Sequence, residues 1–501
     1  MSAPTLPRPR PGRAWPAGPS PSPRRRRLTL RRAERVALAA LALAALAGFL
    51  LYPTYPNYDS VYSLLWGREL LDGRRMTFDA YRAPTQHPLA IALGAVLSLF
   101  GTGADRAFVA FAVGSFVVLL AGLYTLGKAA FTPLVGALAA LLLATRFDFA
   151  FLAARGYIDP AYLALVVWAA VLEVRRPRRG TAVLVLLALA GLLRPEGWVL
   201  AGLYFLWVAW PAPWRNRVRY ALLCAAAPVL WGLTDLVVTG DPLFSLHGTS
   251  ELAAELGRNK GAGAVPTALW AFLLKLAKLP VVLGGAVGLV VAVVLVPLRA
   301  RVPVVLLVVG VATFALVGGL GLSVIDRYLL VPSLMVMVLC GVAFGGWTLL
   351  REGLPVRRAW AALAVALVVA GVAFTAVRLN LTRLDGELAF RADAHDALAA
   401  ALAHPSVAEG LRCGDLHTPN HKLVPEVRWL LDLPEERVLA RSSADAGEPR
   451  RGVALLVHTR DALFRQALVG PPGEDTRHNL PPAGFARRHV TRFYSVYVRC
   501  P

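Results

Sequence analysis

The stretch PTYPNYDSVYSLLWGRELLDGRRMTFDAYRAPTQHP, residues 53–88, follows the first long apolar run of the chain. It is polar, aromatic and rich in proline, and its first acidic residue, Asp59, comes only a few residues after the apolar run ends. If that run crosses a membrane, the Asp59 carboxylate lies near the lipid headgroups, between water and acyl chains. Ionisable groups at such depth are costly and are often functional, so the stretch predicts a site at the membrane surface.

The composition is that of a membrane protein. Of the 501 residues, 57% are hydrophobic and 17% are charged, and the mean hydropathy is +0.56. A spanning helix needs about 20 mostly apolar residues, and such runs recur between residues 33 and 378. We therefore expect an all-α polytopic membrane domain over residues 33–378, with about eleven transmembrane helices.

The net charge of +22 does not indicate nucleic-acid binding, because much of it lies in short clusters between the apolar runs. This is the distribution of cytoplasmic loops under the positive-inside rule. The clusters are residues 24–27, 175–179 and 215–219, Arg299 with Arg301, and Arg357 with Arg358. The chain is thus expected to be a multi-pass protein of the cell membrane that binds membrane lipids and no nucleic acid.

The basic clusters fix the expected orientation. Residues 1–32 predict a disordered, basic cytoplasmic tail, and the helix after them, at about 33–52, leads to an outer loop over 53–105 that carries Asp59. The apolar run 86–101 is short for a span and either crosses or lies at the interface. Only the interfacial alternative keeps the cluster at 175–179 inside, so we reject a crossing there.

The remaining apolar runs alternate between the two faces. Residues 60–72 and 266–279 predict further interfacial helices, as amphipathic segments do. The other spans are expected at about 106–127, 131–147, 160–174, 181–193, 197–211, 218–238, 281–298, 303–323, 328–350 and 359–377. Every strongly basic loop then lies on one side.

Residues 379–501 are polar and mix helix-like with strand-like segments, so we expect a small extracytoplasmic α/β domain. Cys413 and Cys500 bracket most of it and could form a disulfide outside the cytoplasm, although two unpaired thiols remain an alternative. Closing a loop of that length contributes about 4–5 kcal/mol in the chain-entropy model.

Several ionisable residues fall at or just beyond span ends on the expected outer face. Each has a structural alternative: Asp59 and Asp159 as helix caps, Glu196 as a first-turn acid, and Arg327 as a headgroup anchor. Together they exceed what capping needs. The full set is Asp59, His87, Arg155, Asp159, Arg194, Glu196, His247 and Arg327.

A grouping of acids and arginines suits the transfer of a glycosyl group from a polyprenyl phosphate. Such a reaction needs a base for the acceptor hydroxyl. It also needs cationic donors for the departing phosphate, and arginine supplies these through bidentate contacts.

Six segments in order over residues 36–340 resemble the GT-C superfamily of polyprenyl-phosphate-sugar-dependent glycosyltransferases, which includes protein O-mannosyltransferases and lipid A aminoarabinose transferases. They are YPNYDSVYSLLWGRELLDG, QHPLAIALGAVLSLFG, GYIDPAYLAL, GLLRPEG, GDPLFSLHGTS and DRYLLVPSL. The second is similar to the family's "HPPL…FG" stretch with one proline missing. The last is similar to its "RYLLP" element.

The resemblance implies roles for individual residues. By position, Asp59 corresponds to the catalytic first-loop aspartate and Asp159 to the second-loop carboxylate. Arg327 corresponds to a donor-phosphate contact. Many relatives have Asp-Glu where this chain has Asp59-Ser60, so the second carboxylate of that pair is absent at this position.

The mechanism expected from these roles is an inverting displacement by a hexosyl- or pentosyltransferase. Asp59 takes the acceptor's proton and Asp159 orients the sugar or acceptor, while Arg327, with Arg155 or Arg194, stabilises the leaving polyprenyl phosphate. The remaining candidate substrate-binding residues are His87, Glu196 and His247.

The expected partners are a polyprenyl-phosphate sugar donor and a glycan, glycolipid or protein acceptor of the cell envelope. No cluster has the spacing of a protein metal site, so no obligatory cofactor is expected, while a divalent ion bridging the aspartates and phosphate is left open. The alternative functions are a transporter or lipid flippase without glycosyl transfer, and a non-catalytic envelope assembly protein. A transporter places charges near the bilayer midplane, often in repeated halves, which this sequence does not show.

Overall fold

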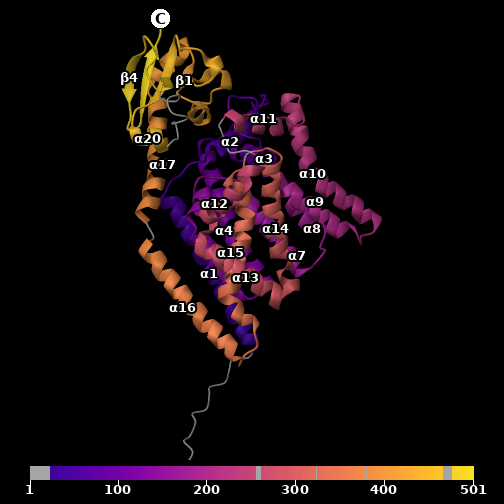
Figure 1. The fold of residues 1–501 in the computed structure, drawn as a ribbon. Coiled ribbons are helices and arrows are strands. Elements are labelled where there is room, and N and C mark those ends of the chain that lie inside the picture. The colour runs from indigo at the N-terminus through magenta and orange to yellow at the C-terminus, as the bar shows by residue number, and fades with distance from the viewer. Residues whose placement is uncertain (1–22, 256–260, 323, 379–380, 466–476) are drawn as a thin grey trace, which may run out of the picture.

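The computed structural model describes residues 23–255, 261–322, 324–378, 381–465 and 477–501. Most of the predicted N-terminal tail, and residues 256–260 of the polar loop before residue 266, therefore lie outside the described residues. The chain forms a helical bundle with a small α/β unit above one end (Figure 1).

The helices of the bundle follow the apolar runs of the sequence. In chain order they are α1 (Pro23–Leu51), α2 (Tyr58–Leu71), α3 (Pro88–Ser98), α4 (Ala104–Ala130), α5 (Pro133–Ala144), α6 (Phe147–Ala154), α7 (Asp159–Arg175), α8 (Thr181–Gly191), α9 (Glu196–Ala209), α10 (Trp214–Thr239), α11 (Phe244–Glu255), α12 (Val265–Ala277), α13 (Leu279–Leu295), α14 (Pro297–Gly319), α15 (Leu330–Gly345) and α16 (Pro355–Arg378). Short 3-10 turns precede α4, α12 and α15 and follow α15.

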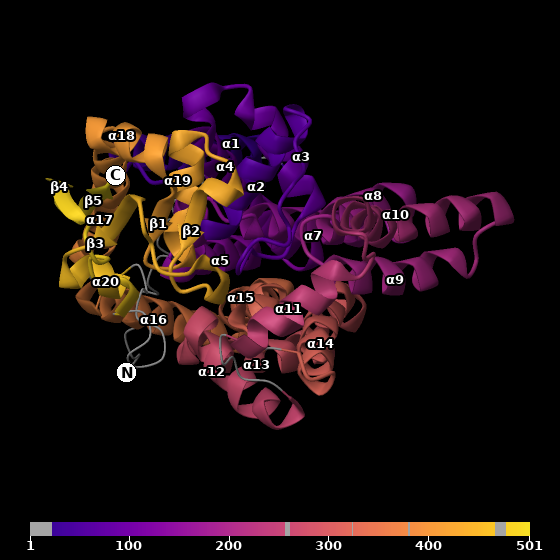
Figure 2. The same ribbon diagram turned by 90° about the horizontal axis from the view of Figure 1, so that it is seen from above.

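Six helical segments of the described chain are long and apolar enough to cross a membrane, or eight if the bent pairs α5–α6 (65°) and α12–α13 (101°) each form one span. The chain is thus a multi-pass membrane protein, but the expected count of eleven spans is not confirmed. Helices α8 and α9 have 11 and 14 residues, which makes them about 17 and 21 Å long. The hydrocarbon core is about 30 Å thick. Together with α10, they project from one side of the bundle (Figure 2).

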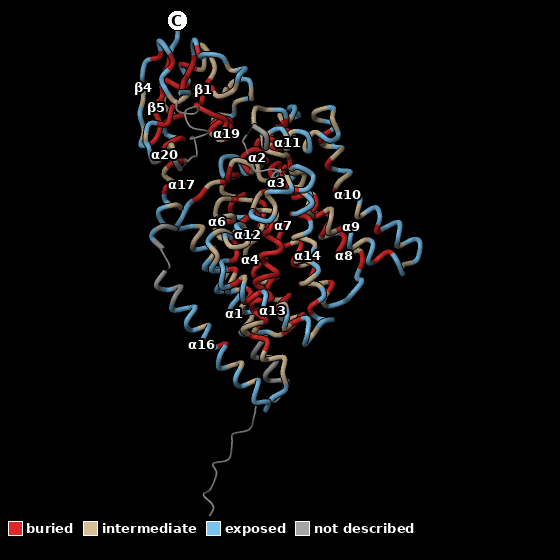
Figure 3. The backbone as a smooth tube through the Cα atoms, in the orientation of Figure 1, coloured by how far each residue is buried: buried red, intermediate tan, exposed pale blue. Residues whose placement is uncertain are grey.

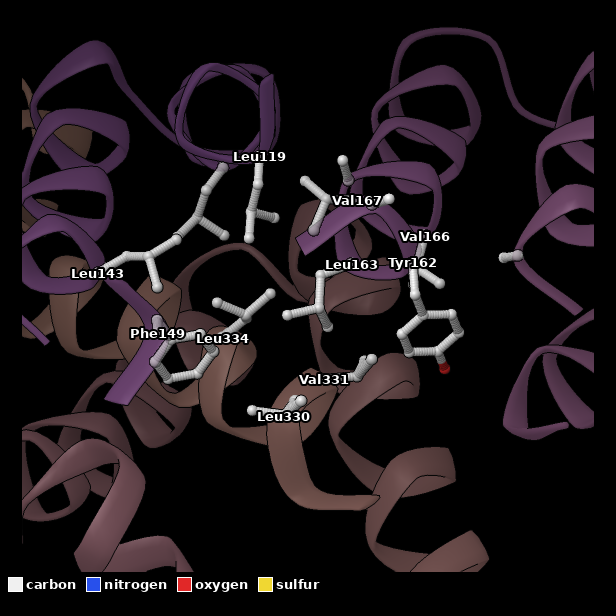
Figure 4. Packing of buried hydrophobic residues seen from close by; sticks show 14 of the residues in the cluster. Leu119, Leu143, Phe149, Tyr162, Leu163, Val166, Val167, Leu330, Val331 and Leu334 are labelled. Carbon is white, nitrogen blue, oxygen red and sulfur yellow. The ribbon is translucent and has the colours of Figure 1, made fainter. Parts of the chain in front are cut away.

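Helix α15 lies at the centre of the bundle (Figure 3). Of the most apolar stretch within residues 326–349, which contains α15, 89% is buried. Side chains from α4, α5 and α7 meet it in one core, as Leu119, Leu143, Leu163 and Leu334 show (Figure 4). By contrast, only 0% and 6% of the most apolar stretches of α1 and α16 are buried. Apolar helices with so little burial suit contact with lipid chains.

Helices α2 and α3 form a close pair at the end of the bundle that faces the α/β unit. A Cβ atom at Gly67 would lie 2.2 Å from the backbone nitrogen of Ala95, and one at Gly94 would lie 2.2 Å from the backbone oxygen of Ser63. The two backbones therefore touch, and only glycine fits at these positions. With 11 residues, α3 is about 17 Å long and shorter than the hydrocarbon core of about 30 Å. The interfacial position expected over 86–101 stays a prediction.

The C-terminal unit is α/β, as expected. Its helices are α17 (Leu381–Leu402), α18 (Pro405–Cys413), α19 (Val424–Leu431) and α20 (Arg460–Arg465), and its strands are β1 (Leu416–Thr418), β2 (Val438–Ala440), β3 (Gly452–Val457), β4 (Ala486–Val490) and β5 (Tyr494–Arg499). The sheet order is β2-β1-β3-β5-β4. Strand β1 pairs in parallel with β2 and β3, while β5 pairs antiparallel with β3 and β4.

A disulfide within the C-terminal unit joins Cys413 and Cys500, whose Cα atoms are 5.8 Å apart. Two further contacts hold the unit against the bundle. Arg428 of α19 is buried and pairs with Glu69 of α2 at 2.6 Å, and the Arg68 guanidinium stacks on Trp429 at 4.5 Å. The unit is thereby fastened to the loop and helix that follow the first span.

Candidate active site

The start of α2 presents Asp59 to solvent. The cap position of this helix belongs to Asn57, whose side chain accepts the Asp59 backbone N–H at 2.9 Å. The Asn57 side chain also donates to Ser60 at 3.0 Å, and the Ser60 hydroxyl donates to the Gly156 carbonyl at 2.7 Å. The capping alternative for Asp59 is therefore wrong, and its carboxylate is left for other partners.

Asp59 lies beside an arginine that is distant in sequence. Arg327 comes from the 3-10 turn Asp326–Leu329 before α15, and its Nη1 and Nη2 donate to Asp59 Oδ2 at 3.3 and 3.4 Å. The side chains are only partly buried, with 28% of Asp59 and 30% of Arg327 exposed. An ion pair this open can exchange one partner for a ligand.

Asp159 is the buried centre of an ionic cluster that also contains Asp59, Arg194, Glu196 and Arg327. Its side chain is 0% exposed, and Oδ1 accepts from Arg194 Nη1 at 2.7 Å. Oδ2 lies 3.9 Å from Arg327 Nη1. The cap position of α7 belongs to Ile158 rather than Asp159. Asp159 thus ties together two arginines from separate loops.

Arg194 connects this centre to a second acid. It lies in the turn between α8 and α9, and its Nε donates to Glu196 Oε1 at 3.3 Å. Burial lowers the pKa of Arg194, but Asp159 and then Glu196 outweigh burial and raise the pKa above its ordinary value. The guanidinium is therefore held as a cation.

The cluster opens into a cavity of about 980 Å³. One wall is apolar and contains Leu316, Val317 and Leu320 at the end of α14. Leu316 and Leu320 are 56% and 68% exposed, so this wall reaches the surface of the bundle. The cavity is thus amphipathic, with apolar and ionic walls.

His87 lines the same cavity. Its ring meets that of Trp231 edge-on with centroids 5.6 Å apart, and its Nδ1 is buried without a hydrogen-bond partner. Burial, then Arg194 and Arg327, lower the pKa of His87 to about 3, so the imidazole is neutral.

Arg155 also lines the cavity, whereas His247 does not. The His247 side chain is 58% exposed and pairs with Asp241 at 2.7 Å. Asp241 in turn accepts the Leu243 backbone N–H at 2.9 Å. Of the predicted catalytic and substrate-binding residues, His247 is thus the one that belongs neither to the ionic cluster nor to the cavity lining.

Several residues of the C-terminal unit complete the cavity and were not among the predicted site residues. They are Arg391, His395, His421, Lys422 and Glu426. His395 stacks on Tyr55 with centroids 3.4 Å apart and pairs with Glu426 at 2.7 Å. No local motif marks these residues, because they meet the cluster only through the docking of the C-terminal unit.

Within the described part of the chain, no group of three or more His, Cys, Asp or Glu side chains is arranged to hold a metal ion. The acids of the cluster are paired with arginines instead.

Comparison with solved structures identifies the fold. The chain is similar to ArnT from Cupriavidus metallidurans bound to undecaprenyl phosphate, with a TM-score of 0.57 and 16% identity over 92% of this chain and 97% of that chain.

It is also similar to the Archaeoglobus fulgidus oligosaccharyltransferase tethered to an acceptor peptide containing the NVT sequon, with a TM-score of 0.51 and 13% identity over 92% of this chain and 74% of that chain. No protein family and no curated sequence matches the chain. The GT-C resemblance of the sequence motifs is thus confirmed at the level of the fold.

Proposed function

We propose that this chain is an integral membrane glycosyltransferase that transfers a sugar from a polyprenyl-phosphate donor to an acceptor of the cell envelope. The observation that carries the proposal is the Asp59–Arg327 pair, which opens into a large amphipathic cavity at one end of the bundle. The fold shared with ArnT, which was solved with undecaprenyl phosphate, supports this class of donor.

In the proposed reaction, Asp59 is the catalytic base. The acceptor hydroxyl oxygen attacks the anomeric carbon, and its proton passes to the Asp59 carboxylate. The bond between the anomeric carbon and the phosphate oxygen breaks, and its electron pair leaves with the polyprenyl phosphate. Attack opposite the leaving group inverts the anomeric centre.

Arg327 binds the donor phosphate and stabilises the charge that develops on it. It lies within 3.4 Å of Asp59, so base and phosphate contact are adjacent. Asp159 is fully buried and contacts both Arg194 and Arg327. We therefore treat Asp159 as a positioning residue that acts through these arginines, in place of the direct contact with sugar or acceptor expected from the sequence. Glu196 supports Arg194 in the same way.

The apolar wall formed by the end of α14 is suited to the prenyl chain of the donor. Leu316 and Leu320 are exposed and also line the cavity, so this wall connects the surface of the bundle with the cavity. His87, held neutral beside Trp231, is placed to contact the donor sugar.

We further propose that the cluster faces away from the cytoplasm. Helix α7 begins at the cluster with Asp159, so the basic residues 175–179 at its other end lie across the bundle. Arg299 and Arg301 near the start of α14 are likewise separated from Arg327 by that helix. Under the positive-inside rule the N-terminus is cytoplasmic and the C-terminal unit external.

The acceptor group is a hydroxyl of a glycan, glycolipid or protein that reaches Asp59, and the sugar is a hexose or pentose. No obligatory metal is invoked. Transfer by the purified enzyme in EDTA at the rate measured with Mg²⁺ is the expected outcome, and loss of transfer in EDTA would contradict it.

The proposal is tested with the Asp59→Asn variant in liposomes that contain a polyprenyl-phosphate sugar donor. We expect transfer to fall about 10²–10⁴-fold, the usual contribution of a general base. The matched control is Asp72→Asn at the other end of α2, where the carboxylate is 47% exposed and pairs with Arg74. A folded Asp59→Asn protein that transfers sugar at the wild-type rate would overturn the assignment.

A further inference from the structure

The cavity is also lined by cations that do not belong to the ionic cluster around Asp59. Arg155 follows α6, and Arg391 lies in α17 of the C-terminal unit. Both line the cavity, together with Lys422. Cations from the bundle and from the C-terminal unit therefore converge on one space.

Three acids that line the cavity are paired with other groups. Asp59 pairs with Arg327, Glu196 with Arg194, and Glu426 with His395. Within the described chain, the Arg155 guanidinium has no hydrogen bond and no ion pair with a carboxylate. Arg155 is thus a partly buried cation without a counter-charge in direct contact.

The position of Arg155 is fixed by the backbone. Its carbonyl accepts the Asn57 backbone N–H at 2.8 Å and the Asn57 side-chain amide at 3.3 Å. Arg155 is therefore held beside the turn that presents Asp59. Burial, and then the like charge of Arg391, lower the pKa of Arg155 to about 10. Glu426 and Glu387 offset part of this shift. An anion bound beside Arg155 would offset the remaining repulsion between the two guanidinium groups.

Resting on the proposed function, we propose that Arg155 and Arg391 bind an anionic group, phosphate or carboxylate, on the acceptor. The enzyme would thus glycosylate a negatively charged acceptor rather than a neutral one. Two guanidinium groups offer the bidentate donors that such anions prefer.

The geometry assigns this anion to the acceptor rather than to the donor. The donor phosphate belongs beside Arg327, next to the apolar wall at the end of α14 that takes the prenyl chain. Arg391 and Lys422 come from the C-terminal unit, which on the proposed orientation lies in the aqueous space. An acceptor that arrives from that space meets Arg155 and Arg391 on its way to Asp59.

The test distinguishes the acceptor anion from the donor phosphate by first filling the donor site. The full-length protein in detergent is first saturated with undecaprenyl phosphate, and inorganic phosphate is then titrated while binding is followed by calorimetry. We expect the saturated wild-type protein to bind inorganic phosphate. We expect Arg155→Gln and Arg391→Gln to weaken that binding about 10- to 100-fold, with little change in the affinity for undecaprenyl phosphate.

Three controls sharpen the result. Arg155→Lys keeps a charge and should retain part of the binding. Arg412→Gln, an exposed residue of the C-terminal unit outside this cavity, should bind as the wild type does. Asp59→Asn should lose sugar transfer yet keep phosphate binding, so failure of the catalytic assignment is distinguishable from failure of the anion site.

Two results would overturn the inference. In the first, saturation with undecaprenyl phosphate abolishes phosphate binding to the wild-type protein, which would show that Arg155 and Arg391 bind the donor phosphate. In the second, Arg155→Gln and Arg391→Gln bind phosphate as tightly as the wild type. The first measurement needs no variant, so the proposal stays falsifiable even where a substitution prevents folding.

Discussion

Helix α2 carries an acid near each end, and each acid pairs with an arginine from a distant segment. At the start, Asp59 meets Arg327 at 3.3 Å, and 28% and 30% of the two side chains are exposed. Near the end, Glu69 meets Arg428 at 2.6 Å, and only 7% and 1% are exposed. The two pairs have the same chemical groups and differ in access to solvent.

This difference in solvent exposure distinguishes a ligand-binding site from a structural contact. The open pair borders a cavity of about 980 Å³ and can rearrange around a ligand. The closed pair does not line that cavity, and it holds α19 against α2. Burial raises the pKa of Glu69 even though Arg428 opposes the shift. The buried pair therefore contributes position rather than reactivity.

The largest effect that separates the two pairs is expected from Arg327→Gln. Removing the cation beside the departing phosphate should lower transfer about 10³-fold, while the melting temperature changes little because the side chain is partly exposed. Sugar transfer and thermal unfolding of the same purified sample provide the measurement. A variant that keeps full activity would show that Arg327 does not contact the donor phosphate.

The next effect comes from the closed pair. Arg428→Met leaves Glu69 buried without its partner and should destabilise the docking of the C-terminal unit by about 3–5 kcal/mol. Hydrogen exchange should rise in α2 and α19 and remain unchanged in α15, at the bundle centre. Equal exchange in wild type and variant would show that the pair does not fasten the two parts. Glu69→Gln keeps a hydrogen-bond acceptor and should have a smaller effect.

The disulfide lies apart from both pairs. Replacing Cys413 and Cys500 with serine should destabilise the C-terminal unit by about 2–5 kcal/mol, because the cross-link closes a separation of 87 residues. Protease resistance of residues 405–501 should fall with no change in the bundle helices. Unchanged resistance in the double variant would contradict a stabilising role.

The smallest effect is expected at Asp72, a surface acid at the end of the same helix. Its pair with Arg74 is exposed, so Asp72→Asn should change stability by less than about 1 kcal/mol and leave transfer unchanged. A large loss of transfer here would mean that charge anywhere on α2, rather than access to the cavity, governs activity.

Much of the site was predictable because its residues lie at helix boundaries. Asp59, Asp159 and Glu196 each fall in the first turn of a helix, and Arg327 precedes one. A break between apolar runs marks such positions in the sequence. Their common face followed from the basic loops at the opposite helix ends.

Other features could not be read from the sequence. The pairing of Arg327 with Asp59 joins residues 268 positions apart, and Arg391 reaches the cavity only through the packing of the C-terminal unit. His247 lies in a polar loop of the sequence like the other candidates, yet on α11 its side chain pairs with Asp241 and is exposed. The expected count of eleven spans is not confirmed, because apolar runs such as α8 form helices shorter than the thickness of the hydrocarbon core.

The central claim is that the donor phosphate binds beside Asp59 and Arg327, and a structure with undecaprenyl phosphate tests it most directly. The account predicts a phosphate oxygen about 2.7–3.2 Å from the Arg327 guanidinium, with the prenyl chain along the end of α14. A phosphate bound at the opposite end of the bundle, or an Asp59 carboxylate turned away from it, would contradict the account.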